Sequence, residues 1–200
     1  MPRSKEAFEA MKETTRNKIE AAALPLFAQK GFSVSVGEIA AAAGVSKGLL
    51  YNNFSSKEAL IAELARQVII ISEQSIKSIA ENNGSAVVKI KKFTSNMCEM
   101  FTDNRAGIDY FMFMTQVGMS GFPIKELVYD VHGLSDPAES LTQIISDGQS
   151  EGSVIRGEPE QLAMAYWAML QGLCCCVLMD MPISPKPEML LRILLKEKFI

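Results

Sequence analysis

Four residues with the chemistry for contacting a nucleic acid, Lys47, Gly48, Tyr51 and Asn52, fall on one face of a short predicted helix. Residues three and four positions apart are neighbours on a helix surface, so this face would point outward as a unit. It offers a cation, a bare backbone, a phenol and a carboxamide. The pattern predicts a helix suited to the major groove of DNA, while a plain helical hairpin with a polar face is the alternative.

The helix that carries these residues is predicted to be the second of a helix-turn-helix. Ser35 and Glu38 form a capping box that opens the first helix. Gly44 supplies the tight turn, and Ser46 caps the second helix, which covers about residues 47–54. Apolar side chains would hold the two helices at a steep angle; they are Ile39, Ala40, Val45 and Leu50.

The chain is predicted to be helical nearly throughout, so the expected fold class is all-α. No segment alternates apolar and polar residues for long, and no hairpin signal appears. A first helix buries one face and ends at Gly31, and a long helix starts at Ser55 or Ser56. Residues 1–60 are expected to form a DNA-binding head and residues 61–200 a helical body. Further helices are predicted at about 86–103, 106–119, 123–132, 136–150, 158–179 and 187–198.

Composition and charge narrow the classes of protein. With 200 residues, 48% of them hydrophobic, the chain is neither disordered nor a disulfide scaffold. The net charge is −3, but residues 1–60 hold 8 basic and 6 acidic side chains, and the remainder holds 12 and 17. The mildly basic first part is therefore the expected phosphate-facing region.

The sequence contains few residues or motifs that could support catalysis or bind a metal. There is one histidine, and no nucleophile elbow, phosphate-binding loop or zinc spacing, so no catalytic residue, metal or cofactor is expected. Cys174, Cys175 and Cys176 are consecutive and point about 100° apart on a helix, which prevents a shared partner. Two alternatives remain open: a thiol-based redox-sensing regulator, and a helical small-molecule-binding protein that never meets DNA.

One apolar stretch requires a membrane test. Residues 161–179 contain no charge, which is close to the length of a spanning helix. Acidic rather than basic residues flank the stretch, and the N-terminal residues lack the apolar core of a signal peptide. A helix buried in a protein interface fits at least as well, so no membrane association and a cytoplasmic location are expected.

Residues 15–64 resemble the DNA-binding domain of the TetR family, the tetracycline-repressor-like one-component regulators. The resemblance rests on IEAAALPLFAQKGF and VGEIAAAAGVSKGLLYNNFSSKEAL, and more loosely on ISDGQSEGSVI in the body. It implies a head of three helices plus the start of a fourth. It also implies a helical body that binds a small ligand and dimerises through its last two helices.

The resemblance assigns roles to the outward face of the second helix. Lys47 would reach a phosphate or a guanine edge, and Gly48 would let the backbone approach a base closely. Tyr51 would bond a phosphate while its ring packs on a sugar or a thymine methyl. Asn52 would pair with adenine through two hydrogen bonds and so read sequence directly.

Further DNA contacts are expected around this helix. Ser35 would offer its hydroxyl to a phosphate, and Ser46 lies at the start of the second helix. Arg16 and Lys57 would clamp phosphates, unless they are ordinary solvated charges. Asn53 is also a predicted DNA contact, since it stands where the family often has a large aromatic residue or a histidine that contacts a phosphate.

The body is expected to hold a hydrophobic effector. Residues 93–119 are rich in Phe and Met, which make adaptable walls for apolar molecules but are also common in plain cores. The single histidine would be a polar anchor. The predicted ligand-binding residues are Phe93, Met97, Phe101, Tyr110, Met114, His132 and Tyr166.

Homodimerisation is expected through the last two predicted helices, residues 158–179 and 187–198. A two-fold axis would present two recognition helices to a pseudo-palindromic operator in double-stranded DNA. The expected function is that of a homodimeric repressor released from its operator by a small hydrophobic effector. The apolar residues predicted at this interface are Leu162, Tyr166, Met169, Leu173, Leu190, Ile193 and Leu194.

Overall fold

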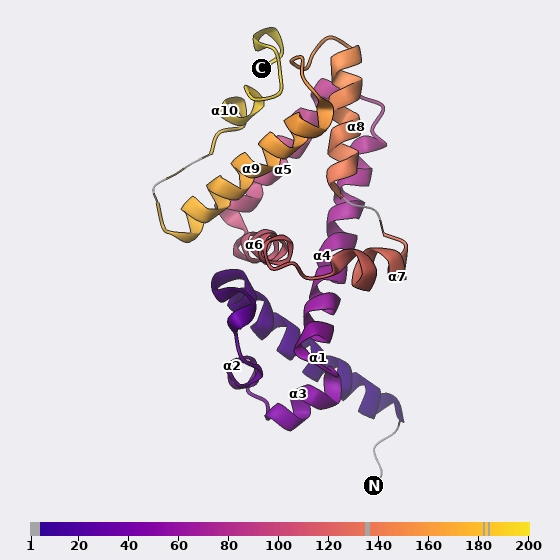
Figure 1. Ribbon diagram of the computed structural model, residues 1–200, viewed down its shortest axis with the longest axis vertical. Helices are drawn as coiled ribbons and strands as arrows, with labels where there is room; N and C mark the ends of the chain where they lie inside the picture. The colour runs from indigo at the N-terminus through magenta and orange to yellow at the C-terminus, as the bar shows by residue number, and fades with distance from the viewer. Residues whose placement is uncertain (1–4, 135–136, 182, 184) are drawn as a thin grey trace.

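The computed structural model describes residues 5–134, 137–181, 183 and 185–200, and it is an elongated helical molecule (Figure 1). Within these ranges no strand is present, and one isolated antiparallel bridge joins Val154 to Leu195. The all-α prediction is confirmed. The helix-turn-helix head and the helical body are also present as predicted.

The head is formed by three helices at one end of the molecule (Figure 1). α1 covers Lys5–Lys30 and is followed by a 3-10 turn at Gly31–Ser33. α2 and α3 are the short helices Val36–Ala42 and Lys47–Asn53. Gly44 in the turn between them has φ 66°, a left-handed conformation that favours glycine.

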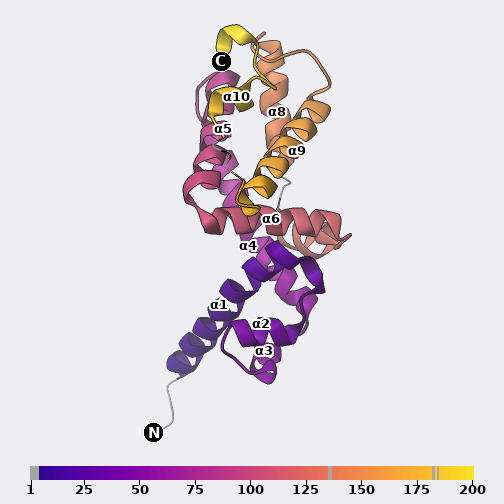
Figure 2. The same ribbon diagram turned by 90° about the vertical axis from the view of Figure 1, so that its left-hand side faces the viewer.

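The body is built on α4, which runs from the head to the far end of the molecule (Figure 1). α6 crosses between the head and the upper helices, as the view turned by 90° also shows (Figure 2). The helices of this part are α4 (Lys57–Ala80), α5 (Ala86–Asp103), α6 (Arg105–Met119), α7 (Asp130–His132), α8 (Pro137–Ser150), α9 (Pro159–Leu178) and α10 (Pro187–Leu191).

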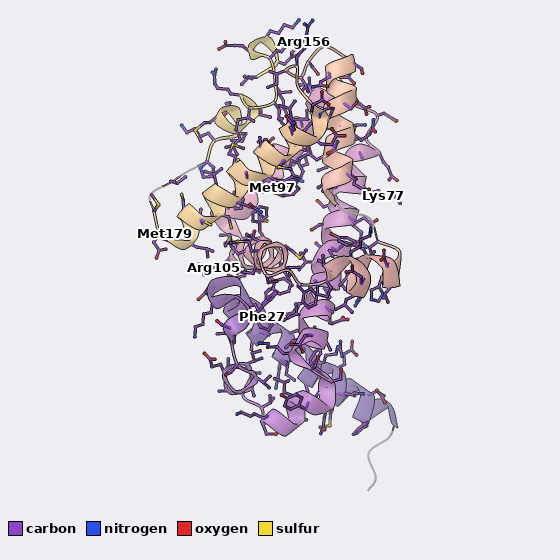
Figure 3. The ribbon with its side chains drawn as sticks, in the orientation of Figure 1. Phe27, Lys77, Met97, Arg105, Arg156 and Met179 are labelled. Atoms are coloured by element: carbon purple, nitrogen blue, oxygen red, sulfur yellow. The ribbon has the colours of Figure 1, made fainter. Side chains whose placement is uncertain are left out.

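The head and the body share one continuous hydrophobic core, and the most extensive helix–helix contact is that of α1 with α6. An aromatic cluster lies at this contact. The ring of Phe113 on α6 lies 6.1 Å from that of Phe27 and 6.0 Å from that of Phe32. Figure 3 places Phe27 at the boundary between the head and α6. Phe27 and Phe113 are fully buried and Phe32 is half-buried, so α6 packs closely against the end of α1 here.

Two predicted helices differ from the structure. Residues 125–129 form a π-helical turn that leads into the short α7, which Gly133 ends with φ 62°. The predicted helix 187–198 is only α10, Pro187–Leu191. Leu195 bridges to Val154 instead, where Ile155 N–H donates to Leu194 O at 2.9 Å and Lys196 N–H to Ser153 O at 3.0 Å. These bonds satisfy the backbone without a helix.

The predicted dimer face is wrong at three of its residues. Tyr166, Leu190 and Leu194 are fully buried in the core of this chain, so their side chains are not available to a second copy. Their apolar spacing reflects packing within the protomer, with α10 against α5. The exposed face of α9 carries other residues, among them Met164 at 71% exposure and Cys175.

α9 is also the helix that passes a membrane test by length and composition, among the residues that the structure describes. Only 22% of its most apolar window is buried within this chain. One such helix is weak support for a membrane span, since helices that pack in protein interfaces pass the same test.

Candidate nucleic-acid interface

α3 lies at the end of the head that is farthest from the body (Figures 1 and 2). Its outward face exposes Lys47, Gly48, Tyr51 and Asn52, and the Tyr51 side chain is 51% exposed. Among the described residues, no side-chain hydrogen bond or ion pair engages Lys47, Tyr51 or Asn52. The structure thus brings these four predicted residues together on a surface with unused hydrogen-bonding groups.

Gly48 leaves the middle of this face without a side chain. A Cβ built there would meet only Ser46 Oγ, at 3.9 Å, so the position is open to solvent. Its backbone is helical, with no positive φ. Glycine in a helix interior costs stability, so the fold itself gives no reason for a glycine here.

Gly48→Ala should therefore raise stability and lower DNA affinity at the same time. The added methyl group should stabilise α3 by about 0.5–1 kcal/mol, while it should weaken operator binding by at least about tenfold if the bare backbone meets a base. Urea unfolding and operator titration measure the two effects. Unchanged affinity would show that nothing approaches this backbone closely.

Lys47 extends from α3 across the start of α2. A Cβ built on Gly37 would lie 2.8 Å from Lys47 Cε and 3.1 Å from its Nζ. The absence of a side chain at Gly37 therefore makes room for the lysine stem. The ammonium group lies beside the first turn of α2, on the same side of the head as α3.

Ser35 and Ser46 act as caps in this structure. Ser35 Oγ accepts from Glu38 N–H at 3.2 Å and donates to Glu38 Oε2 at 2.9 Å. Hydrogen bonds from the Ser35 backbone and hydroxyl, with Lys30 nearby, hold the pKa of Glu38 below its ordinary value. Ser46 Oγ accepts from Leu49 N–H at 3.1 Å. Both hydroxyls fix helix starts and so position α3.

Asn53 turns away from the exposed face. Its Nδ2 donates to Leu49 O at 2.8 Å, and its Oδ1 is buried without a hydrogen-bond partner among the described residues. Its backbone carbonyl accepts from Arg16 Nη1 at 3.3 Å. The structure therefore does not bring Asn53 to the predicted surface, because its side chain closes the end of α3.

Arg16 lies inside a charged network between α1, α3 and α4. Its Nε is 3.1 Å from Glu20 Oε1, its Nη2 is 3.6 Å from Glu63 Oε2, and its guanidinium carbon lies 4.3 Å from the centre of the Phe54 ring. Burial opposes ionisation of Glu63, yet bonds from Arg66 and Gln67 and the charges of Arg66 and Arg16 keep its pKa lowered. All three Arg16 nitrogens thus have partners within the chain.

Lys57 also has internal partners. Its Nζ donates to Phe32 O at 2.7 Å and to Val34 O at 3.3 Å, which ties the first turn of α4 to the segment before α2. An ammonium group has three hydrogens, so one remains for a phosphate. In the structure, Lys57 therefore stabilises the packing of α4 against the segment before α2.

The body contains a cavity of about 600 Å³ between α4, α5, α6 and α9. This size lies within the ordinary range of small-molecule sites. Four of the seven predicted ligand-binding residues line it: Phe93, Met97, Tyr110 and Met114. Met97 is labelled in the view with side chains (Figure 3).

The other three predicted ligand-binding residues do not line this cavity. Phe101 is buried against Phe111, with ring centres 5.6 Å apart. Tyr166 is buried with its hydroxyl 2.7 Å from Thr94 Oγ1, and burial raises its pKa to about 12. His132 lines a smaller cavity of about 320 Å³ between the head and α7.

The sequence reasoning missed Trp167, which lines the large cavity beside Gln171. Neighbouring residues on a helix point about 100° apart, so choosing Tyr166 selected the core side of α9 instead. The signal available in the sequence was the stretch of residues 161–179 without a charge, which indicates a buried helix. Such a stretch does not show which face of the helix meets the cavity.

Among the described residues, the cysteines belong to no group of three or more His, Cys, Asp or Glu side chains that could hold a metal ion. Burial raises the pKa of Cys174 to about 12 and also raises that of Cys98, so both stay protonated thiols. A thiol is a poor nucleophile compared with a thiolate. Cys175 is exposed and Cys176 half-buried.

Sequence comparison places the head among known regulators. A family model described as "Bacterial regulatory proteins, tetR family" matches residues 19–64. The HTH-type transcriptional regulator RutR of Escherichia coli is 30% identical over 154 residues, which are 76% of this chain and 70% of RutR. YerO, an HTH-type transcriptional regulator of Bacillus subtilis, is 29% identical over 137 residues, or 67% of this chain. The chain spans only about half of YerO, since the match covers 47% of that protein.

Structure comparison supports the fold beyond the head. The crystal structure of a gamma-butyrolactone receptor, an ArpA-like protein, superposes with a TM-score of 0.65 at 22% sequence identity. The match covers 95% of this chain and 92% of the receptor chain. At this identity the similarity shows a common fold, and the body as well as the head takes part in it.

Proposed function

Because this chain belongs to the TetR family of bacterial regulatory proteins, we propose that it is a transcriptional repressor that binds an operator through α3. The observation that carries the proposal is the exposed face of α3, where Lys47, Tyr51 and Asn52 have no side-chain partner among the described residues. Polar groups with the chemistry for base edges and phosphates lie there on a helix that projects from the molecule.

In this proposal the residues of the head divide into two groups. Lys47 and Tyr51 contact phosphates, and Asn52 reads a base. Ser35, Ser46 and Asn53 hold the ends of the two helices, while Arg16 and Lys57 brace the head from within. Any phosphate contact of Arg16 or Lys57 is secondary to that role, because all three Arg16 nitrogens have partners within the chain and the Lys57 ammonium group already donates to two carbonyl oxygens.

Asn52→Ala should relax sequence specificity at one base position. The carboxamide is expected to form two hydrogen bonds with adenine, which contribute roughly 1–3 kcal/mol of discrimination. Binding to operator variants with each base at that position measures the loss. Lys47→Ala is the matched control, since it should weaken all variants alike and reduce the salt dependence. Equal losses on every variant for Asn52→Ala would remove its readout role.

Selection of bound sequences from a random DNA pool tests the function as a whole. The recovered sites are then measured at two salt concentrations, since phosphate contacts make affinity strongly dependent on salt. A tightly bound pseudo-palindrome is the expected result. Weak retention without sequence preference would contradict the proposal.

A homodimer is part of the proposal, because a palindrome requires two heads. The surface that supports it is the exposed face of α9, which is the first of the two helices predicted at the interface; of the predicted residues, Tyr166, Leu190 and Leu194 lie in the core instead. Small and apolar residues on this exposed face allow two helices to approach closely about a two-fold axis. The residues are Met164, Ala165, Ala168, Gly172 and Cys175.

Release by a small hydrophobic effector is the last part of the proposal. α6 lines the cavity with Tyr110 and Met114, and it contacts the head through Phe113. Gln116, one turn after Phe113 on α6, lies against Gly31 at the end of α1. A Cβ built on Gly31 would be 3.1 Å from Gln116 Oε1. An effector that favours a shifted α6 would therefore also favour a shifted head, and thus lower operator affinity.

A further inference from the structure

The turn between α5 and α6 borders the large cavity, and Met100, Asn104 and Gly107 all line it. Met100 lies in the last turn of α5, and Gly107 lies in the first turn of α6. Asn104 joins the two helices: its backbone N–H donates to Met100 O at 3.3 Å, and its Oδ1 accepts from Gly107 N–H at 2.9 Å. These bonds fix the backbone of Met100 relative to that of Gly107.

Gly107 is a helical glycine whose backbone conformation does not require one. Its φ is not positive, and glycine destabilises a helix relative to alanine. The space beside it is occupied, however. A Cβ built on Gly107 would lie 2.5 Å from Met100 Cγ and 3.1 Å from Met100 Sδ. The missing side chain therefore lets Met100 lie against α6, where it covers the buried Gly107.

An added methyl group at position 107 would turn Met100 towards the cavity. The Cγ atom is the first beyond Cβ, so a clash at this atom moves the whole thioether and not only its tip. Asn104 closes another side, since its Nδ2 is 3.1 Å from the built Cβ. The cavity of about 600 Å³ is the free space beside Met100. Methionine has three rotatable bonds and adapts its shape readily, so its side chain can occupy this space.

We propose, building on the effector function proposed above, that Gly107 and Met100 set the size of the effector. While Met100 lies against Gly107, this end of the cavity stays open to a large apolar molecule. With a side chain at position 107, Met100 would fill this end, and only smaller molecules would fit. Gly107 is thus a positioning residue, which acts on the effector through Met100 rather than by contact.

Two uncharged fluorescent probes of different size test the proposal on the intact protein. Nile red is the larger and N-phenyl-1-naphthylamine the smaller, and both brighten in an apolar site, so titration gives their affinities directly. Gly107→Ala should weaken Nile red binding at least about fivefold, because overpacking a filled space is costly. Binding of N-phenyl-1-naphthylamine should change by less than about twofold, which makes the small probe an internal control for folding.

Gly118→Ala is the matched control for the added methyl group. Gly118 is also on α6, but it is exposed, and a Cβ built there meets no described atom within 4 Å. Both substitutions replace a helical glycine, so both should stabilise α6. The affinities of Gly118→Ala for the two probes should stay within about twofold of those of the unmodified protein.

A double-mutant cycle with Met100→Ala tests whether the effect passes through the thioether. In the Met100→Ala background, Gly107→Ala should change Nile red affinity by less than about twofold, because the side chain that it displaces is gone. An effect that persists in this background would overturn the proposal, and so would equal weakening of both probes or unchanged Nile red binding by Gly107→Ala alone. Failure of both probes to bind the unmodified protein would instead contradict the effector function of this cavity.

Discussion

Arg16→Ala should lower the free energy of unfolding by roughly 2–3 kcal/mol, far more than loss of a surface charge. The substitution removes the ion-pair partner of Glu20, which is 7% exposed and keeps a hydrogen bond from Gln67 Nε2, and it removes one of the partners of Glu63. A charge left unpaired in the interior costs up to about 3–5 kcal/mol, and the 35% exposure of the Arg16 side chain reduces this figure. The carbonyl of Asn53 also loses a donor, so α3 is held less firmly.

Two further variants separate this network from a general charge effect. Adding Glu20→Gln to Arg16→Ala should recover part of the stability, because the unpaired carboxylate is then gone. Lys30→Ala removes a cation whose ion pair with Glu38 spans 3.4 Å between two exposed side chains, and it should cost less than about 1 kcal/mol. Urea unfolding measures all three. An Arg16→Ala loss no larger than that of Lys30→Ala would show that the network adds no stability.

The internal roles of Arg16 and Lys57 could not be predicted from the sequence. Arg16 bonds a carbonyl 37 residues away, and Lys57 bonds one 25 residues away. Such partners are determined by how the helices pack, while the sequence shows only two cations near a DNA-binding motif. The local features were predictable because they involve residues three apart: the capping box of Ser35 and Glu38 is present as expected.

The C-terminal segment shows the same limit for apolar residues. Leu190 and Leu194 are four apart, and this spacing predicted one face of an interface helix. In the structure both are buried within the protomer, and Leu195 pairs with Val154. Spacing identifies residues that will be buried, but it does not identify the surface that buries them. The cavity residues Phe93 and Met97 could be predicted from the sequence, because residues 93–119 contain more Phe and Met side chains than one helix face can bury.

Phe113→Ala should have the largest effect on the link between the body and the head. Phe113 is fully buried, and its loss leaves a cavity between the rings of Phe27 and Phe32. Removal of a buried phenylalanine side chain costs about 3–5 kcal/mol. Phe113→Leu fills most of the space and should cost less than about 2 kcal/mol. Thermal or urea unfolding of the two variants measures the difference.

Phe113→Ala should also weaken operator binding by about tenfold under conditions in which the protein stays folded. The reason is that the two heads of a dimer match an operator only while α6 fixes their orientation. Phe101→Ala is the matched control: Phe101 on α5 is also buried, at 3% exposure, and packs on Phe111 rather than on the head. It should lose similar stability and keep its operator affinity. If both variants lose operator affinity equally, the loss results from general destabilisation, and the cluster of Phe27, Phe32 and Phe113 does not set the position of the head. If only Phe113→Ala loses affinity, α6 carries the coupling through this cluster, and effectors that fill the cavity act on the operator by way of these rings.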